Sequence, residues 1–260
     1  GNQFQQMTNE AFCIIFRFRD DELVILEERT NFFTCLKKVK SVASKASIRR
    51  KPKKETSMAI VSRRVATPLP GKAALTISRA KSLAEIMVRA GGGARVRKVI
   101  FGDGAGDIHL YGNFADFTSG TKSAAAMNKD PQMAKWQAER EAEPSSHLRG
   151  PEVYRTAFGE PSMKPVILQR TYSIDRANVQ NALALMPELQ GIVGETPLMA
   201  VLPTIASVMD EMLIVYYFDS LEHFGVQLDE VAMSPEFQKL VTKASAYGTL
   251  KSSRLLAAID

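Results

Sequence analysis

A histidine, a tyrosine and an asparagine alternate along one short stretch of this 260-residue chain. They are His109, Tyr111 and Asn113 in the segment 107–115, and apolar residues occupy most of the positions around them. Because successive side chains of a strand point to opposite faces, the three polar groups share one face. An imidazole can act as a base or anchor a ligand, while a phenol and an amide can orient a substrate. The pattern predicts a ligand site here, with His109 as its catalytic residue.

A second strand, 104 residues further on, serves as an internal comparison. Its corresponding residues are Leu213, Val215 and Tyr217, so the same face is mostly apolar there. A pocket with one polar and one apolar wall can orient an amphipathic small molecule. The predicted ligand site therefore includes Tyr217. The alternative interpretation is an ordinary half-exposed strand, on which polar side chains of these types simply face solvent.

Two arginines, Arg64 and Arg170, stand within predicted strands in the two halves of the chain. A charged side chain on a central strand needs a partner or a wet cavity. We therefore predict that both arginines bind an anionic ligand. An ion pair or a register that faces solvent are the alternatives.

The elements that position these residues follow one order twice. Periodicity and breakers predict, in the first half, a strand at 59–66, a helix at 72–90, strands at 94–101 and 107–115, a helix at 130–143 and a strand at 151–158. In the second half they predict a strand at 165–174, a helix at 175–191, strands at 198–206 and 211–219, a helix from 234 and a strand at 253–259. Each half is thus a βαββαβ unit.

Both long second helices begin with a short polar cap followed by proline at the first helical position. Large side chains then match at the same 104-residue offset: Phe114 with Phe218, Met133 with Phe237 and Trp136 with Leu240. A βαββαβ unit is ferredoxin-like, with both helices on one face of an antiparallel sheet. The other face stays uncovered, so two units can bury theirs against each other. The predicted fold class is α+β: two ferredoxin-like units, 58–160 and 161–260, form an α+β barrel after an N-terminal extension, 1–57.

The doubled order and the helix starts DPQMAKW (130–136) and SPEFQKL (234–240) resemble the dimeric α+β barrel superfamily. Its members include antibiotic-biosynthesis monooxygenase-like, NIPSNAP-like and stress-responsive barrel proteins. The resemblance covers Met58–Asp260 and implies an internally duplicated version of the two-unit barrel. It also implies that the barrel binds a small organic molecule and oxidises it without a cofactor. The alternative is a non-enzymatic binding or assembly module with a packed barrel, which a filled interior would favour.

The resemblance draws attention to Trp136, because haem-degrading members of the superfamily use a tryptophan. The internal match to Leu240 predicts a core position instead, and no histidine accompanies Trp136 on its helix. The three histidines, His109, His147 and His223, have no ligand spacing. No metal or cofactor is therefore expected.

The positive charge belongs to the N-terminal extension. Residues 1–57 hold 12 Lys/Arg against 7 Asp/Glu, whereas residues 58–260 hold 22 against 21. The basic run 45–54 is typical of a solvated linker, so nucleic acid is not an expected partner. Met58 stands where an initiator is expected, so residues 1–57 are expected to be a linker or a non-native extension. Apolar spacing within 12–18 and 32–43 also allows a small hairpin or helix there.

The remaining expectations concern location and partners. No run of 18 apolar residues occurs, so no membrane span is expected. The two cysteines, Cys13 and Cys35, give no disulfide framework and favour the cytoplasm. A small organic ligand is the expected partner, and a homo-oligomer remains open.

Overall fold

The structure, a computed structural model, describes residues 10–19, 22–31 and 59–259. The chain divides into two compact units, Gly1–Thr56 and Ser57–Asp260. In the first, β1 (Glu10–Arg19) and β2 (Glu22–Asn31) pair as an antiparallel hairpin. The alternating segment 12–18 lies within β1. The helical spacing at 32–43 and the basic run at 45–54 fall outside the described residues.

Residues 59–259 form a barrel with two halves. The first half contains β3 (Ile60–Pro68), α2 (Ala73–Arg89), β4 (Gly93–Gly102), β5 (Ile108–Phe114), α3 (Phe117–Lys129), α4 (Pro131–Ala142) and β6 (Ser146–Phe158). The second half contains β7 (Val166–Ile174), the 3-10 turn η1 (Arg176–Asn178), α5 (Val179–Leu183), α6 (Met186–Val193), β8 (Leu198–Ile205), β9 (Glu211–Phe218), α7 (Leu221–Gln227), the π-helical turn η2 (Leu228–Ala232), α8 (Pro235–Ala244) and β10 (Gly248–Ala258).

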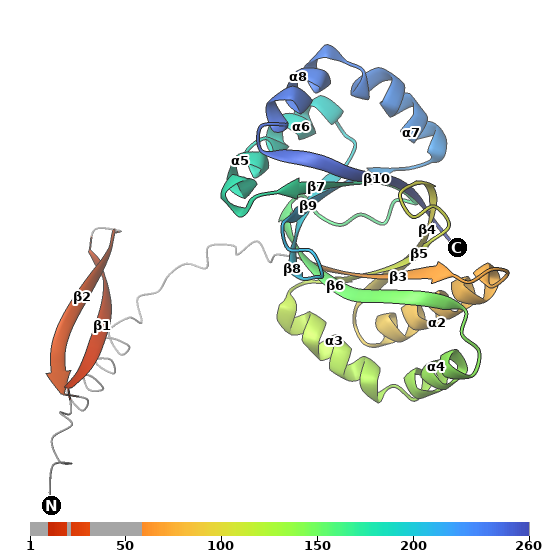
Figure 1. The fold of residues 1–260 in the computed structure, drawn as a ribbon, viewed down its shortest axis with the longest axis horizontal. Helices are drawn as coiled ribbons and strands as arrows, with labels where there is room; N and C mark the ends of the chain where they lie inside the picture. The colour runs from red at the N-terminus through yellow and green to blue at the C-terminus, as the bar shows by residue number, and fades with distance from the viewer. Residues whose placement is uncertain (1–9, 20–21, 32–58, 260) are drawn as a thin grey trace, which may run out of the picture. The chain divides into compact units, whose positions relative to one another are not determined.

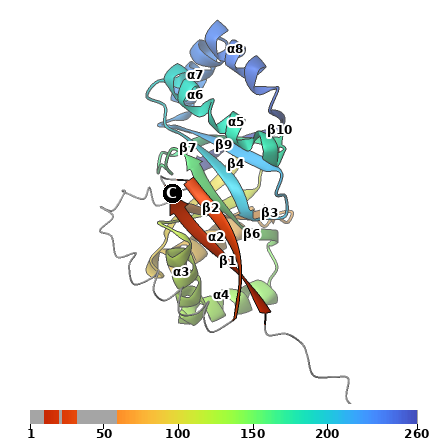
Figure 2. The ribbon, with the colours of Figure 1, turned by 90° about the vertical axis from the view of Figure 1, so that its left-hand side faces the viewer.

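The eight strands close into one antiparallel barrel in the order β10-β4-β5-β3-β6-β8-β9-β7. Each half keeps the ferredoxin-like order of four strands, with its first strand between its third and fourth. The halves join where β6 pairs with β8 and β10 pairs with β4. Helices α2, α3 and α4 cover one side of the barrel and α5 to α8 the opposite side (Figure 1), and a quarter-turn shows the same layering (Figure 2). The predicted pair of ferredoxin-like units is confirmed, and both lie in one chain.

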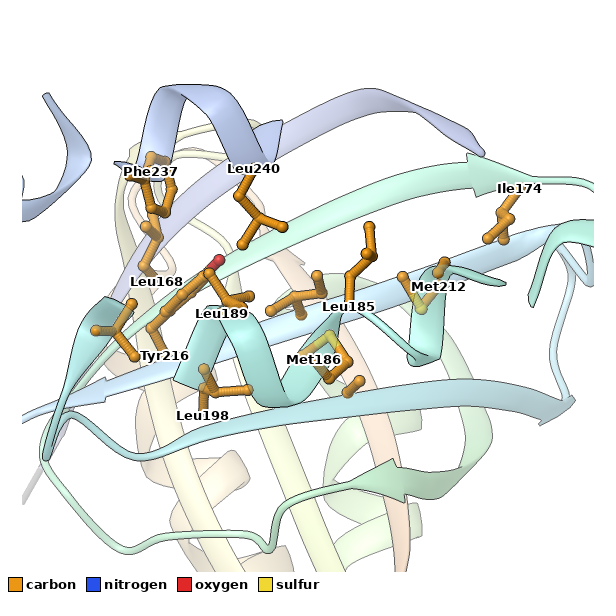
Figure 3. Packing of buried hydrophobic residues seen from close by; sticks show 14 of the residues in the cluster. Leu168, Ile174, Leu185, Met186, Leu189, Leu198, Met212, Tyr216, Phe237 and Leu240 are labelled. Atoms are coloured by element: carbon orange, nitrogen blue, oxygen red, sulfur yellow. The ribbon is translucent and has the colours of Figure 1, made fainter. Parts of the chain in front are cut away.

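Strand alternation divides the apolar core into three layers. In the first half, α2, α3 and α4 pack on the outer face of β3, β4 and β5. In the second half, Leu185, Met186 and Leu189 lie over Met212 and Tyr216 (Figure 3). The third layer fills the lumen with inward-facing side chains: Val61, Val99, Tyr154, Ile167, Met199, Val201, Leu213, Val215, Tyr217 and Leu256.

The third strand of each half is followed by a helix that the periodicity did not predict: α3 in the first half and α7 in the second. In α3 the side chain of Asp116 accepts a hydrogen bond from the Ser119 amide at 2.7 Å. In α7 the Ser220 hydroxyl accepts one from the His223 amide at 3.0 Å. The two caps lie 104 residues apart, so they extend the internal match. Few large apolar residues follow Asp116, which explains why periodicity missed α3.

Two predicted elements differ in extent. The predicted helix at 175–191 is divided into η1, α5 and α6, because Pro187 stands in the first turn of α6. Asp175 makes no side-chain cap there. Strand β6 begins at Ser146 instead of 151, so His147, which lies between the predicted helix and strand, belongs to β6. Gly150, with φ of 89°, allows the strand to continue past Pro151 where the register with β3 shifts.

Candidate functional site

The polar strip on β5 lies inside the lumen and makes a hydrogen-bonded chain. His109 is 0% exposed, and its Nδ1 lies 3.0 Å from the Tyr111 hydroxyl. That hydroxyl donates to Oε1 of Gln169 on β7 at 2.8 Å. Since Tyr111 has one proton to give, its oxygen accepts from Nδ1–H of His109. Nε2 of His109 then keeps a lone pair, and it has no partner among the described residues.

The protonation of this chain follows from its surroundings. Burial, followed by the charges of Arg254 and Arg63, lowers the pKa of His109 from 6.5 to about 3. Burial also raises the pKa of Tyr111, which keeps its proton. A neutral imidazole with so low a pKa is a weak base but a good hydrogen-bond acceptor. The geometry therefore favours a ligand anchor over a catalytic base at His109.

Three predicted ligand residues meet around a small lumen cavity. Tyr111 and Asn113 from the first half and Tyr217 from the second line a space of about 40 Å³, together with Gln169. Burial raises the pKa of Tyr217 to about 12, so this phenol is neutral too. A cavity of this size holds water but no organic molecule. The structure thus brings these residues together around a lumen that is nearly full.

Arg64 faces the opposite side of the sheet, beneath the helices of the first half. Its Nη1 lies 3.8 Å from the sulfur of Met87, and among residues 59–259 it has no carboxylate partner. Burial lowers the pKa of Arg64, but a guanidinium remains charged near neutrality. A cation without a counter-ion in an apolar layer is unfavourable unless another group neutralises it.

A cavity of about 290 Å³ opens beside Arg64. It lies between β3, β5 and β6 on one side and α2, α3 and α4 on the other, and these residues form its apolar part: Val65, Ala66, Ala80, Leu83, Ile108, Leu110, Met127, Met133 and Trp136. Its volume approaches the lower end of small-molecule sites, about 300 Å³. The lining contains no Asp, Glu or His. Exposed Gln137 and Arg140 lie at its outer side.

Trp136 lies half-buried in this wall and packs against the core of the first half. Its indole Nε1 donates to the carbonyl of Arg79 at 2.9 Å. The side chain therefore belongs to the helix–sheet layer, as expected, and it also borders the cavity beside Arg64.

Arg170 occupies the corresponding place in the second half but a different environment. Arg64 pairs across the ladder with Leu110, and Arg170 pairs with Ile214, 104 residues after Leu110. The guanidinium of Arg170 lies 5.9 Å from the ring centre of Tyr216, a cation–π contact. The cavity beside it measures only about 30 Å³. Arg64 and Arg170 therefore do not belong to one site.

A second polar group, which the sequence did not single out, lies at one end of the lumen. Arg63 donates to Glu152 at 2.5 Å and to the Tyr154 hydroxyl at 2.6 Å. Burial alone would raise the pKa of Glu152, but hydrogen bonds from Ser207 and Arg63 lower it to about 2. Glu152 and Tyr154 stand two residues apart in β6 and therefore share one face of the sheet. Only the pairing of β6 with β3 reveals Arg63 as their partner.

Neither a metal site nor a membrane helix is found in the described ranges. No group of three His, Cys, Asp or Glu side chains there is arranged to hold a metal ion. Among the same residues, no helix combines the length and the apolar character needed to cross a membrane.

The fold has known structural counterparts. No protein-family model and no curated protein matches the sequence. An anthrone oxidase-like protein shares 10% sequence identity over 79% of this chain and 93% of its own, with a TM-score of 0.56. A candidate monooxygenase from Fusobacterium nucleatum subsp. nucleatum shares 9% identity over 78% of this chain and 94% of its own, with a TM-score of 0.54. Another, from Lactobacillus acidophilus, shares 12% over 78% and 93%, with a TM-score of 0.51.

These likenesses define a class by fold. The chain has the α+β barrel fold of monooxygenase-like, ferredoxin-fold proteins, and both ferredoxin-like units of the barrel lie within it.

Proposed function

We propose that this protein binds a small acidic aromatic molecule in the cavity beside Arg64 and oxidises it with dioxygen, without a cofactor. The observation that carries the proposal is the guanidinium of Arg64, which has no carboxylate partner among the described residues and lines a cavity of about 290 Å³. The lining is mostly apolar, and Arg79, Arg140 and Arg149 also belong to it. A phenolate or enolate supplies the missing negative charge, and its rings fill the apolar part. The likeness to candidate monooxygenases and to an anthrone oxidase-like protein supports this substrate class.

The chemistry draws its electrons from the substrate. An activated methylene group loses a proton to solvent, and Arg64 stabilises the resulting anion. The carbanion adds to dioxygen, and cleavage of the O–O bond with loss of the second hydrogen gives a carbonyl group and water. The balance is CH2 + O2 → C=O + H2O. Since the cavity lining has no Asp, Glu or His, the substrate must itself be acidic.

Arg64 has a matched control in the other half. We expect anthrone and 1,8-dihydroxyanthrone to raise the melting temperature of the wild type and of Arg170→Met, but not of Arg64→Met. Oxygen uptake with the same compounds should fall at least tenfold in Arg64→Met, because a charge-assisted contact to the anion contributes about 1.5–3 kcal/mol. Equal stabilisation and equal oxygen uptake in both variants would rule out this site.

A filled cavity provides a second test that leaves the charge in place. Ala80 of α2 is partly buried and lines the cavity. The variant Ala80→Met places three more heavy atoms into that space, so ligand binding should be lost while the fold is retained. Circular dichroism and the melting temperature of the ligand-free variant check the fold.

The lumen strip is the second candidate location for the same ligand. The free lone pair of His109 Nε2 and the amide of Asn113 favour it, and the cavity of about 40 Å³ opposes it. His109→Ala and Asn113→Ala separate the two locations in the same screen of flat aromatic and quinone-like compounds. Loss of ligand stabilisation in these variants, with Arg64→Met unaffected, would place the ligand in the lumen with Tyr111 and Tyr217.

The origin and assembly of the chain are part of the proposal. We infer that the two halves arose by duplication, because caps, helix starts and strand ends repeat at an offset of 104 residues. A cytoplasmic location and a homo-oligomer stay predictions. Light scattering after size exclusion measures the oligomeric state.

A further inference from the structure

The second half holds a cavity of about 150 Å³ at the place that matches the cavity beside Arg64, and the proposed oxidation does not use it. It lies between β7, β9 and β10 on one side and α5, α6 and α8 on the other. Six of its lining residues stand 104 positions after residues that line the first cavity: Met212, Ile214, Phe237, Leu240, Val241 and Ala244. Both halves therefore leave space at the same point of the helix–sheet layer, and the space is not a gap left by one side chain.

The matching positions of the two cavities differ in charge. Gln137 and Arg140 stand at the outer side of the first cavity, and Val241 and Ala244 take their places in the second. Arg170 does not line the second cavity, and none of the described residues that line it is charged. An ion that entered would lose its hydration without gaining a counter-charge. The second cavity therefore suits a neutral molecule.

One buried polar group of this lining has no partner. Tyr216 is 6% exposed, and its ring extends from β9 toward the helices (Figure 3). Its hydroxyl makes no hydrogen bond within residues 59–259, and burial raises the pKa of that hydroxyl, which keeps its proton. The other hydroxyl groups of the lining are less suited, because Tyr172 is only partly buried and Ser245 already donates to the carbonyl of Thr242 at 2.6 Å. Since a phenol both donates and accepts, Tyr216 matches a ligand that carries a single hydroxyl group.

The size and the edge of the cavity fit one aromatic ring. An apolar space of about 150 Å³ holds a molecule of the size of benzene. Val241 and Leu250, which are 43% and 48% exposed, border the space and mark the side from which a ligand enters. We infer that this cavity binds a small neutral phenol, with its ring among the apolar side chains and its hydroxyl bonded to that of Tyr216. The inference goes beyond the proposed oxidation, because it needs neither Arg64 nor an acidic ligand.

Three probes of similar size separate the ring from the hydroxyl and from charge: 4-methylphenol, toluene and benzoate, each titrated at pH 7 and followed by ligand-detected NMR. We expect 4-methylphenol to bind most tightly. Toluene should bind about threefold or more weakly, because it lacks the hydroxyl, and benzoate should not bind. Toluene that binds as tightly as 4-methylphenol, or benzoate that binds more tightly, would overturn the ligand class. If 4-methylphenol does not bind at about 10 mM, beyond the millimolar range, the inference is wrong.

A matched pair of filling variants locates the site. Ala244→Met fills the second cavity, and Ala80→Met fills the first. Binding of 4-methylphenol should be lost in Ala244→Met and retained in Ala80→Met. The opposite result would place the phenol in the cavity beside Arg64 and overturn the assignment. Circular dichroism and the melting temperature of the ligand-free variants check that both are folded.

The hydroxyl of Tyr216 provides a test that leaves the packing in place. In Tyr216→Phe the affinity for 4-methylphenol should fall about threefold, to that of toluene, while the affinity for toluene stays unchanged. Equal affinities for 4-methylphenol in the wild type and in Tyr216→Phe would show that this hydroxyl does not bind the ligand, and the inference would be wrong. Arg64→Met should bind 4-methylphenol as the wild type does, so a failure of the proposed oxidation leaves this result unaffected.

Discussion

The two halves of the barrel place an arginine at the same point of the sheet and surround it differently. In the second half the ring of Tyr216 lies beneath Arg170, and little space remains. In the first half the matching position is Gly112, and Met87 and Ser62 occupy the space above it. A cavity of about 290 Å³ lies beside Arg64. The register is equivalent, since Tyr216 pairs with Leu168 and Gly112 with Ser62, each two residues before the arginine. The second half also has a cavity, of about 150 Å³, but Tyr216 lines it and Arg170 does not. The two halves therefore place their arginines differently relative to the cavity of the helix–sheet layer.

The lumen shows the same division. The first half contributes His109 and Tyr111, and the second half contributes Leu213 and Val215 at the matching positions. Apolar side chains in the second half fill space and need no partners. Polar side chains in the first half need hydrogen bonds, and His109 Nε2 lacks one. At these matching positions the first half presents hydrogen-bonding groups to the lumen, and the second half presents apolar side chains.

The largest expected effect comes from removing a buried ring of the second half, that of Tyr216. Tyr216 is buried in the main core cluster, so Tyr216→Ala should lower the free energy of unfolding by about 3–5 kcal/mol. Urea unfolding measures the loss. Tyr216→Phe keeps the ring and should cost about 1 kcal/mol or less. A small effect of Tyr216→Ala would show that this ring contributes little to the core.

The reverse change in the first half should cost less. A Cβ at Gly112 would lie 2.3 Å from Cε of Met87 and 2.6 Å from Oγ of Ser62. Gly112→Ala should therefore destabilise the fold by about 1–3 kcal/mol through overpacking. Gly120→Ala, within α3, is the control. A Cβ at Gly120 would lie at an ordinary 3.6 Å from the side chain of Phe114. The control should stabilise the protein by about 0.5–1 kcal/mol. If both variants changed the free energy of unfolding in the same direction, this explanation would be wrong.

The polar lumen wall should make the protein sensitive to acid. The unfolded chain binds a proton at His109 near pH 6.5, but the folded chain does so only near pH 3. Stability from this group is complete above pH 6.5 and is lost as the pH falls toward 3. His109→Leu introduces the leucine that the second half has at the matching position, Leu213. Between pH 7 and pH 5 the variant should lose about 1–2 kcal/mol less of its free energy of unfolding than the wild type. Glu152 stays ionised over that range, because its pKa is about 2. Parallel stability curves for both proteins would refute the depressed pKa.

The smallest effect is expected for the extension. Deleting residues 1–57 should leave the melting temperature of the barrel within a few degrees, because the barrel forms its own compact unit. Thermal unfolding monitored by circular dichroism provides the check. Insoluble protein after the deletion would show that the extension is needed for folding or assembly.

The strand order and the barrel could be predicted because strand alternation and proline-marked helix starts act over short distances. Asp130 and Ser234 cap α4 and α8 as the sequence indicates. Helix α3 was not predicted, because the sequence after Asp116 is rich in Ser, Thr and Ala and shows little apolar periodicity. The continuation of β6 through Gly150 depends on a bulge against β3, which neither sequence stretch reveals alone.

The candidate site was only partly predictable for a similar reason. Alternation placed His109, Tyr111 and Asn113 on one face, which the structure shows to be the lumen. It did not reveal Gln169, because the contact crosses between the two halves of the barrel. Alternation also does not state which neighbouring arginine faces inward: Arg63 faces the lumen and Arg64 faces the helices. The cavity beside Arg64 depends on how three helices pack on the sheet, which a pattern of polar and apolar residues does not encode.

The closure of the barrel within one chain, through β6 with β8 and β10 with β4, has a consequence for how such a protein can change over time. In a barrel made from two identical chains, every substitution would occur in both halves. A histidine on one lumen wall would then face a second copy of itself. Here each wall is encoded separately. A substitution in one half leaves the matching position of the other half unchanged, so matching positions such as 112 and 216 can carry residues as different as glycine and tyrosine.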